Sequence, residues 1–179
     1  MKHQILWSAI MLATATLGNS CQSEQKPSDR ISVWEDDSNI SLSSNVVEVP
    51  FQRTAGNLAE VKVSLNGVTF NMWWDTGASM TCISALELQN LCKEGRISLD
   101  DYQGRILSRI ADGSSTESFV FNIKEIYIQG LNNQYLRLQD IDAMVSPNQD
   151  APLLIGQNII QNLPPHKFRE DAGVIEFEK

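Results

Sequence analysis

The sequence predicts an all-β domain that closes into a barrel and carries one or two short helices. Three observations support this fold class. Short runs of apolar residues recur along the chain, turn residues separate them at short intervals, and only two segments have the spacing of a helix. Of the 179 residues, 42% are hydrophobic, which is enough for one compact core. The formal net charge of −8 argues against nucleic acid as the main partner.

Residues 1–20 are expected to be a signal peptide rather than part of the fold. Lys2 is followed by an apolar stretch that ends at Leu17 and is too short to span a bilayer comfortably. Small residues then lead to Cys21, and this arrangement resembles a bacterial lipoprotein signal, which implies that the cysteine is lipidated after cleavage. Gly18 departs from that pattern, since an apolar residue is usual at its place. An ordinary secretory signal that is cut nearby is the alternative.

Residues 21–45 are predicted to be a flexible linker that follows the lipidated cysteine; local docking of Ile31, Val33 and Trp34 is the alternative within it. Polar and turn-forming residues dominate this segment, so it cannot bury enough apolar surface to offset the entropy lost on ordering. The folded domain is expected to cover residues 46–179.

The first strands of the domain are predicted at residues 46–51, 61–65 and 68–74. Asn66-Gly67 separates the last two and is a strong signal for a two-residue hairpin turn. Alternation in the third strand directs Phe70, Met72 and Trp74 to one face, which we assign to the core. Trp73 and Asp75 then lie on the other face.

A short helix is predicted directly after this region. Ser84 and Glu87 form a capping-box pattern, and Gly95 is expected to end the helix. One face of this helix is apolar and consists of Ala85, Leu88, Leu91 and Cys92.

The second half of the domain is predicted to contain more short strands. Residues 106–110 and 118–123 flank the polar turn 111–115 and form a hairpin. The remaining elements are strands at 125–129, 135–138 and 141–145, a short helix over 156–163, and a terminal hairpin of residues 167–168 and 174–177.

Asp75-Thr76-Gly77-Ala78-Ser79 follows the apolar strand, and Leu153-Leu154-Ile155-Gly156 lies downstream. Together, these two stretches resemble the active-site loop and the supporting strand of retropepsin-like aspartic proteases. The resemblance covers about residues 46–179. The alternative for the first motif is an ordinary turn with a solvated aspartate.

The resemblance implies a role for each residue of the loop. Asp75 is the expected catalytic acid/base, and the Thr76 hydroxyl is expected to form a hydrogen bond across a dimer axis. Gly77 permits close approach of the backbone there. Ser79 is expected to form a hydrogen bond near the carboxylate, although retroviral members often have an acid at this place. Ala78 completes the loop, and Gly156 is expected to support it from behind.

The same resemblance implies a flap over the substrate, with Asp112, Gly113 and Ser114 at its tip. Retroviral flaps contain more glycine, and a plain surface hairpin is the alternative.

Peptide hydrolysis by carboxylates requires two of them on one water molecule. The chain has one Asp-Thr-Gly, so the resemblance implies a homodimer in which each copy supplies one aspartate. We therefore predict an aspartic endopeptidase that is lipid-anchored at the bacterial cell envelope, faces the periplasm or the exterior, and cleaves peptides or proteins. No cofactor and no metal ion is expected. The alternative is a non-catalytic lipoprotein that binds peptides or acts as a scaffold with the same fold.

Other reactive residues predict less. Cys82 and Cys92 are expected to be free thiols, because one precedes the helix and the other lies near its end. A Cys–His dyad would require His166, which we expect in a surface loop. Trp73 could line the substrate cleft or an interface, or pack under a neighbouring loop.

Overall fold

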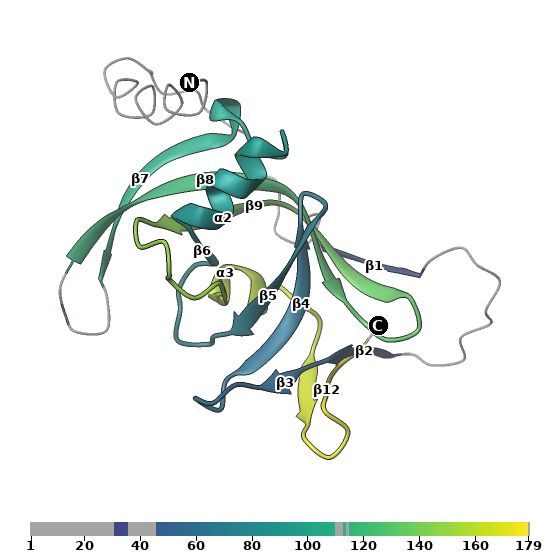
Figure 1. The fold of residues 1–179 in the computed structure, drawn as a ribbon. Helices are drawn as coiled ribbons and strands as arrows, with labels where there is room; N and C mark the ends of the chain where they lie inside the picture. The colour runs from purple at the N-terminus through teal and green to yellow at the C-terminus, as the bar shows by residue number, and fades with distance from the viewer. Residues whose placement is uncertain (1–30, 36–45, 110–112, 114, 179) are drawn as a thin grey trace.

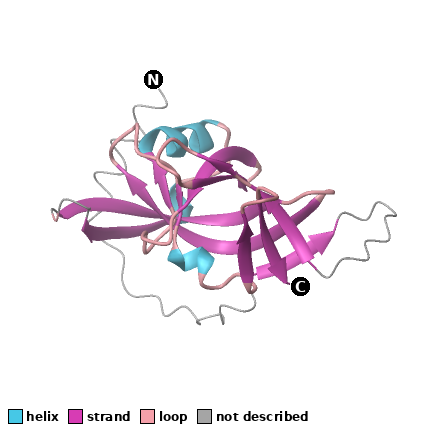
Figure 2. Cartoon of the chain, turned by 90° about the horizontal axis from the view of Figure 1, so that it is seen from below, coloured by secondary structure: helices cyan, strands magenta, loops and turns pink. Residues whose placement is uncertain are grey.

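The computed structural model describes residues 31–35, 46–109, 113 and 115–178. Strands predominate in this part of the chain, and two short α-helices lie among them (Figures 1 and 2). The strands are β1 (Ile31–Glu35), β2 (Val46–Pro50), β3 (Gln52–Arg53), β4 (Ala59–Leu65), β5 (Val68–Trp74), β6 (Cys82–Ser84), β7 (Tyr102–Arg109), β8 (Ser115–Gln129), β9 (Gln134–Ser146), β10 (Leu154–Ile155), β11 (His166–Arg169) and β12 (Val174–Glu178). The helical elements are α2 (Ala85–Lys93), the 3-10 turn η3 (Leu99–Asp101) and α3 (Gln157–Ile160).

Six of the strands pair in a closed ring, in the order β9, β6, β10, β5, β4, β8 and back to β9. The β5–β10 and β6–β9 pairs are parallel, and the other pairs of the ring are antiparallel. A ring of this kind is the connectivity of a barrel, because every member strand has two neighbours. The predicted all-β fold class with short helices is confirmed.

The core lies inside this ring and follows the alternation of the strands. In β4, Val61, Val63 and Leu65 are almost fully buried, whereas Lys62 between them is exposed. Met72 and Trp74 of β5 join the same core, as predicted, and Phe70 packs at its margin. Each fully buried side chain of this size contributes about 1.5–3 kcal/mol relative to an exposed one.

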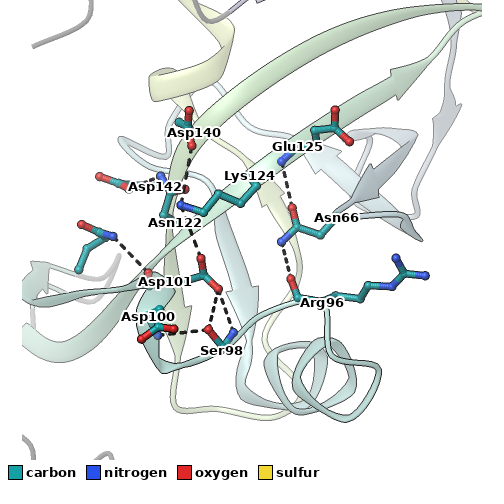
Figure 3. Close-up of polar contacts among 11 residues, drawn as sticks. Asn66, Arg96, Ser98, Asp100, Asp101, Asn122, Lys124, Glu125, Asp140 and Asp142 are labelled. Atoms are coloured by element: carbon teal, nitrogen blue, oxygen red, sulfur yellow. Dashed lines mark hydrogen bonds and ion pairs between the residues drawn. The ribbon is translucent and has the colours of Figure 1, made fainter.

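The predicted hairpin between β4 and β5 is confirmed. Asn66 and Gly67 have φ values of 47° and 89°, so both central residues occupy the left-handed region that a two-residue turn of type I′ requires. The Asn66 side chain also accepts a hydrogen bond from the Glu125 backbone N–H at 2.9 Å and donates one to the Arg96 carbonyl at 2.9 Å (Figure 3).

Helix α2 begins and ends where the sequence predicts. Ser84 is its N-cap, and the Ser84 hydroxyl oxygen accepts a hydrogen bond from the Leu86 N–H at 3.1 Å. The Glu87 carboxylate contacts the Ser84 hydroxyl, rather than the backbone N–H of the cap as the capping-box pattern predicted. Gly95, with φ of 67°, turns the chain away after the helix.

The strands predicted separately in the second half are longer and continuous. Residues 118–123 and 125–129 both belong to β8, and residues 135–138 and 141–145 both belong to β9. The two long strands pair with each other from Phe119–Val145 to Gln129–Tyr135. The register passes from Ile123–Ile141 directly to Glu125–Gln139, at a point where Asp140 has φ of 52°, and both strands continue beyond it. The helix predicted over 156–163 is confined to α3, and the terminal hairpin is formed by β11 and β12.

A second, three-stranded sheet has the order β11, β12, β2. It joins the first strand after residue 45 to the end of the chain, and it packs against Trp74 through aromatic rings. The Trp74 ring lies 5.5 Å from that of His166 and 6.0 Å from that of Phe177.

The flexible linker predicted over residues 21–45 requires correction at residues 31–35. These residues form β1, which pairs antiparallel with β9 from Ile31–Leu138 to Glu35–Gln134. The segment Ile-Ser-Val-Trp-Glu is rich in β-branched and aromatic residues, and the edge of β9 provides it with a partner. Cys21 and the predicted signal peptide 1–20 lie outside the described residues, as do Asp112 and Ser114 of the predicted flap. Within the described part of the chain, no helix has the length and apolar character to cross a membrane.

Candidate active site

Strand β5 delivers Asp75 to the edge of the barrel. Trp74 points into the core and is 4% exposed, so the next side chain, that of Asp75, points to the other face and is half-exposed. Strand β10 runs beside this end of β5. The Trp73 N–H donates to the Leu153 carbonyl at 2.8 Å, and the Asp75 N–H donates to the Ile155 carbonyl at 3.1 Å. The backbone of Asp75 is therefore fixed by the strand that carries the downstream apolar motif.

Trp73 packs against the neighbouring strand. Its indole N–H donates to the Glu60 carboxylate on β4 at 3.2 Å, and its ring is half-buried. Of the roles considered for Trp73, this arrangement supports a packing role.

The Asp75 carboxylate accepts a hydrogen bond from the backbone N–H of Gly77 at 2.8 Å. This contact closes a short turn in which the side chain bonds to the backbone two residues later. We expected the hydroxyl of Ser79 near the carboxylate, but in the described structure neither Thr76 nor Ser79 uses its exposed hydroxyl in a hydrogen bond. The Asp75 carboxylate accepts from the backbone of its own turn, so it does not need these hydroxyls as donors. The hydroxyls of Thr76 and Ser79 are therefore accessible to solvent or to another chain.

Gly156 lies directly against the back of the loop. A Cβ atom at this position would lie 2.3 Å from the carbonyl carbon of Met80 and 2.7 Å from the nitrogen of Thr81. These distances are far shorter than van der Waals contact, so only glycine fits between the loop and helix α3.

Asn158 links Thr81, which follows the loop, to strand β9, and the sequence did not predict this role. Its Oδ1 accepts hydrogen bonds from the N–H of Thr81 at 2.7 Å and from the hydroxyl of Thr81 at 3.0 Å. Its Nδ2 donates to the carbonyl of Asp142 on β9 at 2.8 Å. Thr81 is fully buried, so its polar groups need these partners.

Gln157 contacts the loop that carries Asp75. Its backbone N–H donates to the Ala78 carbonyl at 2.8 Å, and its side-chain Nε2 donates to the Thr76 carbonyl at 2.8 Å. The signal that could have indicated both Gln157 and Asn158 is their place directly after Gly156, in a helix that is held against the loop.

Further polar contacts lie between β8, β9 and η3 (Figure 3). The Asn122 amide donates to the Asp142 carboxylate at 3.2 Å. Lys124 lies 3.6 Å from Asp101 and 3.9 Å from Asp140. These contacts connect β8 to β9, the strand whose Asp142 carbonyl accepts from Asn158, and to η3.

The predicted flap hairpin is formed by β7 and the first part of β8 (Figure 1). Its last described pair is Arg109–Ser115, and residues 115–118 of β8 pair with β7 alone. Gly113 has φ of 86°, a conformation that favours glycine. Asp112 and Ser114 fall outside the described residues.

The thiols do not form a nucleophile with histidine. Cys82 and Cys92 are free, and burial raises the pKa of both thiols, with the nearby Asp101 raising that of Cys92 further. His166 begins β11 and does not lie in the expected surface loop. Its ring nitrogen Nδ1 lies 3.0 Å from the Pro164 carbonyl, and its ring packs at a tilt against that of Phe177. A Cys–His mechanism therefore has no support here.

The described structure presents one carboxylate at this place, that of Asp75. In the described part of the chain, no second carboxylate forms a hydrogen bond with Asp75, and no cluster of His, Cys, Asp or Glu could hold a metal ion. In peptide hydrolysis, a single carboxylate can take a proton from the attacking water, but it cannot at the same time donate a proton to the peptide carbonyl oxygen.

A sequence model of the family described as "gag-polyprotein putative aspartyl protease" matches residues 61–162. These residues include Asp75, Gly156 and Asn158. A solved structure described as a retropepsin-like aspartic protease from Rickettsia conorii is similar, with a TM-score of 0.49 and 14% sequence identity. That similarity covers 73% of this chain and 89% of the other. A search of curated protein sequences finds no match.

Proposed function

The chain belongs to the retropepsin-like aspartic protease family, and on this premise we propose that it is an endopeptidase whose active site is shared by two copies of the chain. One observation carries the proposal. The Asp75 carboxylate is half-exposed at the end of a barrel strand, while its loop is fixed by Gly77, Gly156 and Asn158. A carboxylate that is both accessible and held in place is what proton transfer to and from water requires.

In the proposed reaction, the two Asp75 carboxylates of a dimer flank one water molecule and share one proton. The ionised carboxylate takes a proton from the water, and the water oxygen attacks the peptide carbonyl carbon. The protonated one donates its proton to the carbonyl oxygen, and a proton is later passed to the leaving amine. Two adjacent carboxylates do not both ionise easily, so the singly protonated pair persists over an intermediate pH range. We assign the β7–β8 hairpin, with Asp112, Gly113 and Ser114, as the flap over the peptide.

The geometry of the terminal sheet supports pairing of two copies. Among the described strands, β11 pairs with β12 alone, so its outer edge offers unpaired backbone groups to a strand of another copy. This sheet packs on Trp74, the residue next to Asp75. Pairing there brings a second catalytic loop near the first, and the exposed Thr76 hydroxyl is then available across the axis.

The test of catalysis is the substitution Asp75→Asn. The side chains have nearly the same size, so the fold is retained while the proton acceptor is lost. We expect cleavage of a mixed peptide library by the wild type across acidic to neutral pH and no cleavage by Asp75→Asn. Asp150→Asn changes an exposed aspartate outside the site and is the matched control. Cleavage that persists in Asp75→Asn would refute the aspartic protease proposal. A folded wild type that binds peptides without cleaving them would favour the non-catalytic binding lipoprotein.

We also propose that Cys21 is lipidated and holds the domain at the bacterial envelope, on the periplasmic or the outer side. Lipoprotein maturation supplies more than one acyl chain, and two membrane signals suffice for stable anchoring. Cys21→Ser is expected to move the protein from the membrane fraction to the soluble fraction in cells. A variant that still sediments with membranes would exclude Cys21 as the attachment point.

A further inference from the structure

The peptide unit between Thr76 and Gly77 is hydrogen-bonded at both of its ends. Its N–H, on Gly77, donates to the Oδ1 atom of Asp75 at 2.8 Å. Its carbonyl, on Thr76, accepts from the Nε2 atom of Gln157 at 2.8 Å. A side chain from α3 therefore holds one end of the same peptide unit whose other end contacts the catalytic carboxylate.

The two bonds reinforce each other. A peptide carbonyl that accepts a hydrogen bond withdraws electron density from its own N–H, which becomes a stronger donor by about 10–30% in condensed-phase estimates. The planar peptide also turns as one body, so a bond that fixes the carbonyl direction fixes the N–H direction. Gly77 has no side chain that could hold this plane by packing.

The backbone of Gln157 is held against the loop. Its N–H donates to the Ala78 carbonyl at 2.8 Å, and it directly follows Gly156, which lies against Met80. The Nε2 atom therefore approaches the Thr76 carbonyl from a helix start that is already docked on the loop. The Thr76 carbonyl lies in an exposed residue, where water could bond to it without fixing its direction.

We propose that Gln157 is a positioning residue of the protease, acting through the Thr76–Gly77 peptide on the Asp75 carboxylate. The inference rests on the proposed function. A well-directed N–H donor favours the ionised carboxylate, which is the form that takes the proton from water. Gln157 thereby extends activity towards lower pH and raises the turnover number, with little effect on substrate binding.

The test uses Gln157→Met in the full-length protein. Methionine has a similar length and leaves the backbone N–H bond to Ala78 in place, but it has no donor for the Thr76 carbonyl. A hydrogen-bond donor that contacts the oxyanion of the transition state directly contributes on the order of 100-fold in turnover. Gln157 acts on Asp75 only through the Thr76–Gly77 peptide, so we expect a smaller contribution. We expect kcat to fall about 3- to 10-fold with KM within about 2-fold of the wild type. The acidic limb of the pH profile should move to higher pH by a few tenths of a unit.

Gln157→Glu provides a second variant with its own signature. An ionised glutamate cannot donate to the Thr76 carbonyl, whereas a protonated one can. The loss of kcat in Gln157→Glu relative to the wild type should therefore become smaller as the pH falls, whereas the loss in Gln157→Met should not. Gln161→Met changes the exposed glutamine at the C-cap of α3; it is the matched control and should keep the wild-type profile.

The outcomes separate this inference from the proposed function. An inactive wild type, or an active Asp75→Asn, refutes the proposed function itself. Cleavage that depends on Asp75, together with an unshifted pH profile in Gln157→Met, overturns the role of Gln157 even if kcat is lower. If Gln157→Met unfolds at the assay temperature, the pH dependence of the Gln157→Glu deficit decides, and a deficit that stays constant with pH overturns the inference.

Discussion

The two ends of strand β5 are held in different ways. At its start, Asn66 and Gly67 form the turn from β4 with their own backbone conformations, and hydrogen bonds of Asn66 with Arg96 and Glu125 are added to a turn that these two residues already define. At its end, the Asp75 loop has little structure of its own and depends on α3, whose residues follow about 80 positions later. The backbone conformation of the first end is determined by the turn residues themselves, whereas the Asp75 end is held by distant residues that meet it only in the folded barrel.

This difference explains what the sequence could predict. The Asn-Gly turn, the Ser84 cap and the terminal hairpin were predicted because neighbouring residues determine them. The Asp-Thr-Gly motif identified the candidate catalytic residue. The hydrogen bonds of Asn158 and Gln157 were missed, because their place after Gly156 indicates nearness to the loop but does not show which of its groups, 77 or 81 residues earlier, each amide bonds to.

Other misses have the same physical origin. Lys124 in β8 and residues 139–140 in β9 suggested strand ends, yet both strands continue through these positions and pair with each other on either side of them. Residues 31–35 were assigned to a linker because their partner, the edge of β9, lies about 100 residues later.

The largest effect is expected for Gly156→Ala at the catalytic end. A methyl group 2.3 Å from the Met80 backbone must displace the loop, so we expect a loss of at least about 3 kcal/mol in free energy of unfolding. Activity should fall by more than the unfolded fraction explains. Denaturant unfolding and peptide cleavage measure the two effects. Gly56→Ala, where the new Cβ would lie 3.8 Å from its nearest neighbour, is the control. A Gly156→Ala variant with wild-type stability would contradict the close packing.

Asn158→Ala should follow in size. It removes the acceptor for two donors of the buried Thr81, and each buried donor left without a partner costs about 1–3 kcal/mol. We expect lower stability and a lower kcat, since the loop is released on one side. Asn162→Ala, which removes an exposed amide of the following turn, is the control and should change both by little. If Asn158→Ala and Asn162→Ala lowered the free energy of unfolding and kcat by the same amounts, the proposed role of Asn158 in holding the loop would be refuted.

Gly67→Ala tests the local end of β5. A residue with a side chain at φ of 89° is strained, so we expect a loss of about 1–2 kcal/mol in free energy of unfolding. Because the turn lies at the other end of the strand from Asp75, kcat of the folded protein should not change. A Gly67→Ala variant that loses turnover at full folding would show that the two ends are coupled.

The smallest effect concerns pH and the contacts beside this turn. The hydrogen bond from Arg137 is the largest cause that lowers the pKa of Glu125, with a smaller contribution from the Tyr127 hydroxyl. A carboxyl with a lowered pKa in the folded state stabilises the fold above its unfolded pKa of about 4.3, and this stabilisation is lost as the pH falls through the folded value. The pair is partly exposed, so we expect less than about 1 kcal/mol. The free energy of unfolding, measured by denaturant unfolding at several pH values between neutral and acidic, should fall less steeply with decreasing pH in Glu125→Gln than in the wild type. The same pH dependence in both proteins would exclude this contribution.

The central claim is that two chains share one active site, and subunit mixing tests it most directly. Wild-type protein is held at a fixed amount, at a total concentration at which it sediments as a dimer, and inactive Asp75→Asn is added in increasing ratio. If each site needs one Asp75 from each copy, random pairing should reduce the activity to about half at an equal ratio and further in excess. An unrelated protein added at the same mass should have no effect. Activity that stays proportional to the amount of wild-type chain, whatever the amount of Asp75→Asn, would contradict the shared site.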